Sequence, residues 1–288
     1  MRLGLATPVV IRVPGTASEW EAAGGVDDLG RIAADADRLG YAYLTCSEHV
    51  AVPVEAAAVR GGTYWDPLAT LSFLAARTER IRLVTSVLVL GYHHPLEIAK
   101  RYGTLDRLSG GRLTLGVGVG SLREEFDLLD CAWDDRGARG DDAMRALRAS
   151  LSTTRPSFDG EFYRFDGLVV EPCAVQQRVP LWVGGRTRRS LRRAVELGDG
   201  WTPFGLRTDE LAKHLGSVDY PDDFAVVLST APVDPIGAPQ RTLEQIAQLA
   251  DIGATDVSAV IAADSAAHYR EQLAALAELA GLDSRERS

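Results

Sequence analysis

The sequence of 288 residues predicts an α/β protein built as a single (β/α)8 barrel. Three observations indicate this fold. Short runs rich in Val, Ile and Leu alternate with helix-like segments, which is typical of a parallel sheet covered by helices. About eight such runs are present, which is the number that closes a barrel. No Gly-x-Gly-x-x-Gly follows the first run, and this disfavours a doubly wound open sheet, the alternative fold.

The individual elements follow from apolar spacing and from helix start and stop signals. Asp66-Pro67 supplies a capping acid and a proline for the first helical turn, and Gly40 is a good terminator. The expected strands are 3–7, 41–45, 81–87, 113–119, 181–184, 200–203, 225–229 and 257–262. The expected helices are 26–39, 68–76, 95–108, 187–197, 241–252 and 266–279.

Two stretches are too long to be simple connections. Residues 122–140 are charged and contain Trp133, and residues 157–172 predict a hairpin. Long insertions after the strands of a barrel lie over its C-terminal mouth, where chemistry takes place. We therefore expect residues 1–282 to form the barrel, with insertions at the mouth, and residues 283–288 to form a polar tail.

Composition narrows the classes of partner. The net charge of −9 disfavours binding to nucleic acid or anionic lipid. No apolar run approaches the roughly 18 residues that span a membrane, and the N-terminus lacks a signal-peptide layout, so we expect a cytoplasmic location. The three cysteines form neither a zinc pattern nor a disulfide framework.

Unusual residues follow the predicted strands, at the end where a barrel carries its active site. Glu48-His49 follows the second strand, and such a pair can hold a tautomer or bond a ligand ring. His93-His94 follows the third strand. Adjacent histidines point apart and no third ligand is suitably spaced, so we expect no metal and only one histidine in the pocket.

Glycines mark the ends of the fourth and fifth strands. Gly118, Gly120 and Ser121 end the fourth strand, where bare backbone lets a flat ring or a phosphate approach. Gly184-Gly185-Arg186 links the fifth strand to a helix start, which is a backbone site for anions. Arg186 is the preferred anion ligand among several nearby arginines. A packed strand and a solvated helix face are the respective alternatives.

Together these segments resemble the luciferase-like monooxygenase family of flavin and deazaflavin oxidoreductases. The resemblance is carried by Ile81–Leu90, by His94-Pro95, and above all by Leu-Asp-Arg-Leu-Ser-Gly-Gly-Arg at 105–112, which precedes Gly-Val-Gly-Val-Gly at 116–120. It continues through Glu124-Glu125-Phe126 and resumes at Pro180-Leu-Trp-Val-Gly-Gly185 and Gly198-Asp-Gly-Trp201. It covers residues 1–205 well and the remainder only by the order of elements.

The resemblance implies a ring cofactor at the mouth, coenzyme F420 in preference to FMN. In the deazaflavin branch a non-prolyl cis peptide supports the ring from behind, and Ser86-Val87 matches it. Glu48-His49 matches an acid–histidine pair near the deazaflavin. The phosphate region matches Gly118, Gly120, Ser121, Gly184 and Gly185. Some F420-dependent relatives have glutamate where this chain has Ser121, and their sugar-phosphate ligands are not evident, so a sugar-phosphate substrate is not expected.

The resulting hypothesis is hydride transfer between F420 and a small organic substrate, with His49 as the proton donor. Two alternatives stay open. One is an FMN-dependent monooxygenase, since the same loops serve both rings. The other is a non-catalytic cofactor-binding barrel whose mouth is filled by Trp133 or by the 157–172 hairpin. Family members are often dimers through the helices after the second and third strands, so a homodimer is a further expectation.

Overall fold

The computed structural model describes residues 1–282 and contains a closed barrel of eight parallel strands. The predicted tail at 283–288 lies outside the described residues. Parallel pairing runs from strand to strand around the ring, and the pairing between β7 and β10 completes it. The strands are β1 (Arg2–Leu5), β3 (Tyr43–Cys46), β5 (Arg82–Thr85), β7 (Leu113–Gly118), β10 (Leu181–Gly184), β11 (Gly200–Thr202), β12 (Ala225–Ser229) and β13 (Asp256–Ala259).

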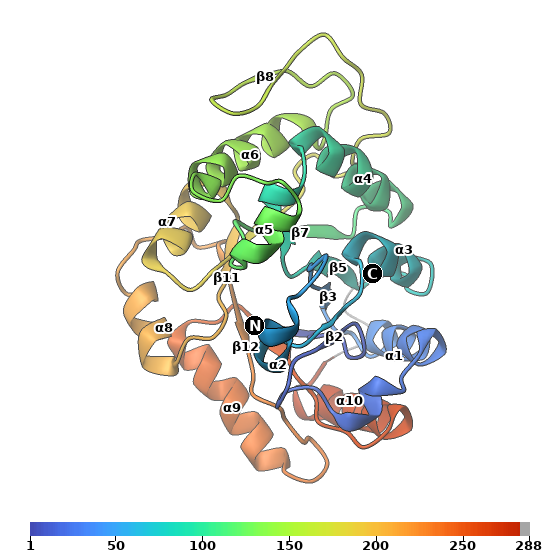
Figure 1. Ribbon diagram of the computed structural model, residues 1–288. Helices are drawn as coiled ribbons and strands as arrows, with labels where there is room; N and C mark the ends of the chain where they lie inside the picture. The colour runs from blue at the N-terminus through green and yellow to red at the C-terminus, as the bar shows by residue number, and fades with distance from the viewer. Residues whose placement is uncertain (283–288) are drawn as a thin grey trace.

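Helices form a ring around these strands, as the view in Figure 1 shows. The structure confirms the predicted barrel and adds two helices to the ring, α6 and α8, that were not predicted. Most of the buried residues of α6 are small or polar, and α8 buries only Leu211 and Leu215, so both apolar patterns are weak. The eight helices are α1 (Val26–Arg38), α3 (Pro67–Ala75), α4 (Pro95–Leu108), α6 (Arg136–Ser150), α7 (Arg188–Leu197), α8 (Thr208–Leu215), α9 (Pro239–Ile252) and α10 (Ala266–Leu279).

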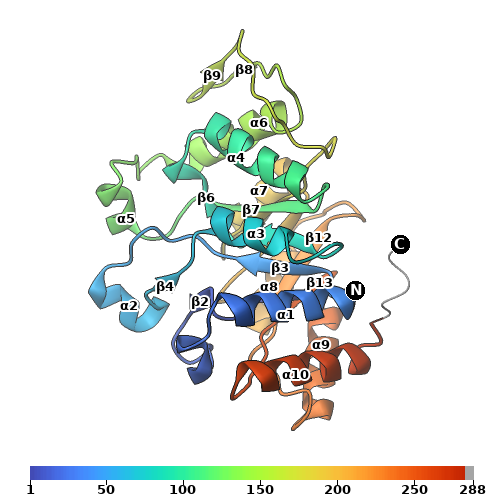
Figure 2. The same cartoon turned by 90° about the vertical axis from the view of Figure 1, so that its right-hand side faces the viewer.

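Short elements cover the C-terminal ends of the strands. After β3 come α2 (Val54–Arg60) and β4 (Thr63–Tyr64), and β4 pairs with β2 (Ile11–Arg12). After β5 the chain forms β6 (Leu88–Val89) and the 3-10 turn η2 (Leu90–Tyr92), and after β7 it forms α5 (Arg123–Leu128). Another 3-10 turn, η1 (Glu19–Ala22), follows β2. Figure 2 shows α2 and α5 together at one end of the barrel, away from the N-terminus.

The predicted hairpin at 157–172 is present as β8 (Phe158–Asp159) and β9 (Arg164–Phe165), but it does not lie over the mouth. It follows a helix, not a strand, so it leaves the barrel at the opposite end. It then lies outside α4 and α6 (Figures 1 and 2). Asp142 of α6 accepts hydrogen bonds from the backbone N–H groups of Phe162 and Tyr163, at 2.8 and 3.1 Å.

At the end of the barrel opposite the mouth, Arg112 and Asp106 hold the connections between helices and strands together. The Arg112 guanidinium donates to the carbonyl oxygens of Ser109, Ile81, Ala75 and Thr78 at 2.7–3.1 Å, and so ties the end of α3 to the starts of β5 and β7. Asp106 is fully buried. Its carboxylate accepts from the backbone of Leu113, Val175 and Gln176. Both residues belong to the segment that carries the family resemblance.

Aromatic and small side chains fill the interior of the barrel. Tyr43 and Trp182 meet edge to face with ring centroids 5.4 Å apart, and both are buried with Val84 and Val227. Gly4 leaves room for Tyr43, because a Cβ at Gly4 would lie 2.4 Å from the ring. Within residues 1–282, no helix combines the length and apolar character needed to cross a bilayer.

Candidate active site at the barrel mouth

The end of β5 carries the feature that the resemblance implied. The Ser86–Val87 peptide bond is cis. The end of β3 holds this bulge: Ser86 N donates to the Cys46 carbonyl at 2.7 Å, and the Ser47 hydroxyl donates to the Ser86 carbonyl at 2.5 Å. Glu48 N donates to the Val87 carbonyl at 3.3 Å. Ser86 and Val87 both remain half-buried at the mouth.

The Val87 side chain explains two of the predicted glycines. A Cβ at Gly118 would lie 2.7 Å from Val87 Cγ2, and one at Gly184 would lie 2.8 Å from Val87 Cγ1. The bare positions therefore hold this side chain between β7 and β10. Ser86, Val87, Gly118 and Gly184 are thus brought together, and packing is a sufficient reason for both glycines.

The third predicted glycine, Gly120, positions α5. Its φ of +82° is a conformation that glycine adopts readily. A Cβ there would lie 2.3 Å from the ring of Phe126, and a Cβ at Gly91 would lie 2.6 Å from the same ring. The ring also meets Tyr92 and Trp133 edge to face, at 4.9 and 5.2 Å. Phe126 therefore anchors α5 beside η2.

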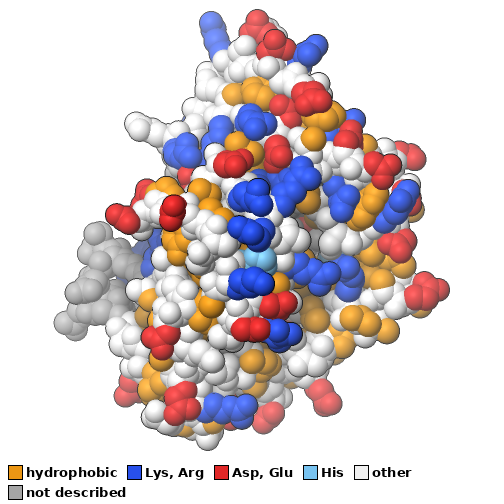
Figure 3. Space-filling view, turned by 90° about the vertical axis from the view of Figure 1, so that its left-hand side faces the viewer, with side chains coloured by type: hydrophobic (Ala, Val, Ile, Leu, Met, Phe, Trp, Pro, Cys, Tyr) orange, Lys and Arg blue, Asp and Glu red, His pale blue; other side chains and the backbone are white. Residues whose placement is uncertain are grey.

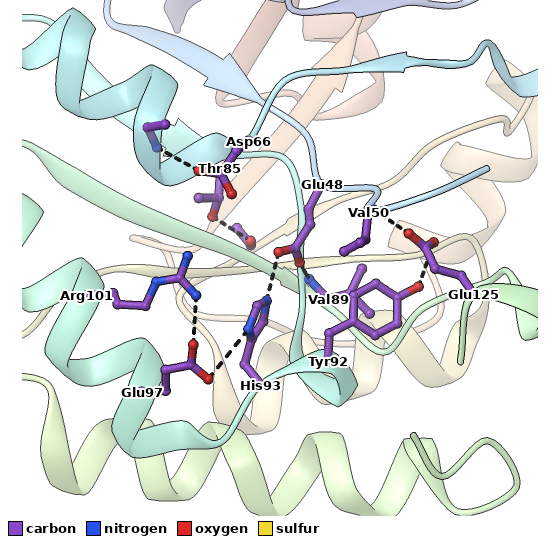
Figure 4. A network of polar contacts seen from close by, with 12 residues as sticks. Glu48, Val50, Asp66, Thr85, Val89, Tyr92, His93, Glu97, Arg101 and Glu125 are labelled. Atoms are coloured by element: carbon purple, nitrogen blue, oxygen red, sulfur yellow. Dashed lines mark hydrogen bonds and ion pairs between the residues drawn. The ribbon is translucent and has the colours of Figure 1, made fainter. Parts of the chain in front are cut away.

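Glu48 and His49 are neighbours in the sequence but bond to different partners. Figure 4 shows Glu48 pointing toward Val89 and His93. Its carboxylate accepts from Val89 N at 2.6 Å and lies 2.7 Å from His93 Nε2. His93 Nδ1 lies 3.9 Å from Glu97, so both nitrogens of this ring face carboxylates. Of the two predicted histidines at 93 and 94, His93 is thus half-buried in the network, while His94 is exposed and caps α4.

His49 pairs with Glu125 of α5, 76 residues further along the chain. His49 Nδ1 lies 2.7 Å from Glu125 Oε2, and the Tyr92 hydroxyl donates to the same oxygen at 2.7 Å. The backbone N–H groups of Val50 and Ala51 donate to Oε1. Burial alone would raise the pKa of Glu125, but the hydrogen bonds from His49, Tyr92 and Ala51 outweigh it and lower that pKa. Glu125 is therefore an ionised, buried acceptor.

The remaining predicted residues lie at the outer edge of the mouth. Gly185 has φ +132°, and a Cβ there would meet Ser190 at 2.7 Å, where the N-terminal cap of α7 forms. Arg186 is exposed next to this helix start. Ser121 is also exposed, and its hydroxyl accepts a hydrogen bond from Arg60 of α2 at 3.1 Å. An anionic group bound at Ser121 would therefore also face Arg60.

The helix α7 gives this acidic chain a local basic surface. Arg186, Arg188, Arg189 and Arg192 are exposed, and within residues 1–282 the structure shows no ion pair for any of them. Figure 3 shows Lys and Arg side chains gathered on the face of the molecule that carries α7. A groove of about 340 Å³ beside this helix is lined by Asp141, Arg189, Arg192, Arg193 and Glu196.

Sequence reasoning did not identify Tyr92 and Glu125 as members of these networks, and it expected one of His93 and His94 in the pocket without naming which. The only sequence signal for Glu125 is an acid placed five residues after Gly120, in the segment Glu124-Glu125-Phe126. The signal for Tyr92 and His93 is their place directly after a strand. None of the three could be paired with its partner from spacing alone.

Comparison with known sequences identifies the family. The model of the luciferase-like monooxygenase family matches residues 1–219. An uncharacterized protein of Mycobacterium tuberculosis is 31% identical over 277 residues, covering 86% of this chain and 94% of that protein. An FMNH2-dependent dimethylsulfone monooxygenase of Pseudomonas putida is 28% identical over 179 residues, covering 60% of this chain and 47% of that enzyme.

Solved structures agree in fold. The monooxygenase RslO1 of Streptomyces bottropensis has a TM-score of 0.73 and 24% identity, covering 96% of this chain and 98% of that chain. An F420-dependent secondary alcohol dehydrogenase, solved with an F420–acetone adduct, has a TM-score of 0.72 and 13% identity, covering 98% of this chain and 99% of that chain. At these identities the likeness shows the fold alone. Because the family model matches residues 1–219, the chain belongs to the luciferase-like monooxygenase family of oxidoreductases.

Proposed function

We propose that the protein is an F420-dependent oxidoreductase that transfers a hydride between the deazaflavin and a small organic substrate. The observation that carries the proposal is the half-buried Ser86–Val87 segment at the mouth, which Ser47 and Glu48 hold and which Gly118 and Gly184 accommodate. The F420-dependent alcohol dehydrogenase among the structural neighbours supports a fold suited to this cofactor.

The residues at the mouth fit such a cofactor. Ser86 and Val87 would support a flat ring, since both are half-buried where the glycines of β7 and β10 leave no competing side chain. Gly120 and Ser121 on one side, and Gly185 and Arg186 on the other, would hold the phosphate region. The guanidinium of Arg186 is exposed beside a helix start and has no ion pair with any residue in 1–282, which suits an anion.

When bound, F420 supplies a carbon that donates or accepts a hydride. This chain supplies position and proton transfer. His49 is 15% exposed, and its Nε2 is not bonded to any residue in 1–282, so this atom would give a proton to the substrate or take one from it. Burial and the Glu125 hydrogen bond raise the pKa of Tyr92, which keeps its phenol protonated as a donor.

An FMN-dependent monooxygenase is the second candidate. The likeness to the FMNH2-dependent monooxygenase of Pseudomonas putida favours it. The third hypothesis, a non-catalytic barrel, loses the support expected for it. The hairpin at 157–172 lies outside α4 and α6, and Trp133 packs within its own insertion against Phe126 and Arg136.

The test is a titration of the apo-protein with F420 and, separately, with FMN, followed by fluorescence quenching. Tight F420 binding with weak FMN binding supports the proposal, and the reverse result replaces it with the monooxygenase.

Arg186→Ala should weaken F420 binding about tenfold or more, which corresponds to the loss of one charge-assisted hydrogen bond. Arg192→Ala is the matched control, because it removes an exposed arginine from the second turn of α7 and should leave binding unchanged.

A further inference from the structure

Two carboxylate–imidazole pairs lie at the mouth, and they differ in what they leave free. His93 has a carboxylate at each ring nitrogen, Glu48 at 2.7 Å and Glu97 at 3.9 Å. His49 has a carboxylate at Nδ1 only. Within residues 1–282 its Nε2 has no hydrogen-bond partner, and the nearest ring is that of Tyr64, edge-on with centroids 4.5 Å apart. Of these two histidines, His49 is therefore the one with a ring nitrogen that no carboxylate faces.

The carboxylate at Nδ1 dictates where the hydrogen of neutral His49 resides. An ionised carboxylate has no hydrogen to donate. Glu125 is 1% exposed and receives four donors, two at each oxygen: the Val50 and Ala51 amides at Oε1, and His49 and the Tyr92 hydroxyl at Oε2 (Figure 4 shows those of Val50 and Tyr92). The Nδ1 atom must therefore carry the hydrogen, and Nε2 is then the basic atom.

We propose that Glu125 is the positioning residue of this site: it holds His49 as the Nδ1–H tautomer, with Nε2 left as the atom that exchanges a proton with the substrate. The proposal rests on the proposed function for the use of Nε2, and on the contacts alone for the tautomer. The arrangement follows the general logic in which a buried acid orients a catalytic imidazole.

Glu125 also has a structural role that the test must separate from this one. Its Oε1 binds the backbone at 50–51, and its helix is anchored by Phe126. Loss of the carboxylate could therefore disturb the loop after β3 without any effect on the tautomer. A measurement of the hydrogen position on His49 is sensitive to the positioning role and insensitive to a small loss of stability.

The experiment is long-range ¹H–¹⁵N correlation NMR on the full chain labelled with ¹⁵N-histidine, at about pH 8, where free imidazole is neutral. The chain has five histidines, and the signals of His49 are identified by their absence in His49→Gln. Wild-type protein should show the Nδ1–H pattern. In Glu125→Gln the amide oxygen can still accept from the 50–51 backbone, which turns the NH2 group toward Nδ1. The hydrogen should then move to Nε2.

Tyr92→Phe is the matched control. It removes one donor from the same carboxylate oxygen but leaves the ion in place, so His49 should keep the wild-type tautomer. A wild-type spectrum with the Nε2–H pattern would overturn the proposal even if Glu125→Gln does not fold. An unchanged tautomer in folded Glu125→Gln would overturn it as well. Failure of F420 to bind would refute the proposed function and leave the tautomer result standing.

Discussion

The packing of Val87 against two glycines makes a quantitative prediction about stability. In Gly118→Ala the new methyl group would lie 2.7 Å from Val87 Cγ2, well inside van der Waals contact. Val87 cannot move away freely, because its other methyl group already lies where a Cβ of Gly184 would be, at 2.8 Å. Overpacking of this kind costs about 1–3 kcal/mol, and because Val87 is half-buried and blocked on one side only, the expected loss is about 2 kcal/mol.

A double-mutant cycle measures this contact. Val87→Ala removes two methyl groups from a half-buried side chain and should cost about 1–2 kcal/mol. It also removes the atoms that a methyl group at position 118 would strike. The double variant should therefore be about as stable as Val87→Ala alone, with a coupling energy of about 2 kcal/mol between the two sites.

The assay is urea unfolding followed by circular dichroism, with thermal melts as a second measure. Gly62→Ala is the matched control, because its Cβ would meet only Ala57 at an ordinary 3.6 Å and should change stability by less than about 0.5 kcal/mol. The reasoning is refuted if Gly118→Ala is as stable as the wild type. Additive losses in the double variant would also refute it.

Three other measurements test separate parts of the structure. Arg112→Lys should lower the free energy of unfolding in urea by about 2–4 kcal/mol, because a lysine cannot reach the several carbonyl groups that the guanidinium binds. The affinity for F420 should stay unchanged. Equal stability of the variant and the wild type would contradict the role of Arg112 as a clamp. Burial alone would raise the pKa of Asp199, but the hydrogen bonds from the Leu181 amide and Arg148 outweigh burial, so the pKa is lowered. The stabilisation that ionised Asp199 gives to the fold is thus complete above the unfolded pKa of about 3.9 and is lost as the pH falls through the folded pKa. Asp199→Asn should therefore lower the free energy of unfolding by about 1–3 kcal/mol at pH 7 and by progressively less below pH 4. A loss that does not depend on pH would argue against ionic binding. His49→Ala should reduce turnover about a hundredfold or more and change F420 affinity much less. Turnover is measured by following the oxidation of reduced F420 with any substrate that this assay identifies. Unchanged turnover would remove the proton-transfer role of His49.

The barrel could be predicted from the sequence because its strands are buried on both faces and read as continuous apolar runs. The strands at 181–184 and 225–229 and the helices at 95–108 and 266–279 were predicted with the bounds that the structure has. The helix α6 was not predicted, because it begins inside a charged stretch and buries mostly small side chains. The place of the hairpin was predicted wrongly, since the helix before it had been missed.

The site could be predicted as a set of strand ends, but its pairings could not. Consecutive residues of an extended chain point in opposite directions, so Glu48 and His49 separate into different networks. The partner of His49 comes from 76 residues away, on a helix whose position depends on one aromatic ring lying over Gly91 and Gly120. Such a contact is a property of the folded chain and leaves no periodic pattern in the sequence.

The clamp made by Asp106 and Arg112 has a practical consequence for protein engineering. Its hydrogen bonds lie at the end of the barrel away from α2 and α5, and they use backbone atoms of the barrel itself. The loops that carry α2 and α5 can therefore be exchanged for those of other family members without disturbing the clamp. A chimaera that keeps residues 104–118 and replaces 119–135 should therefore retain the stability that the clamp gives to the scaffold.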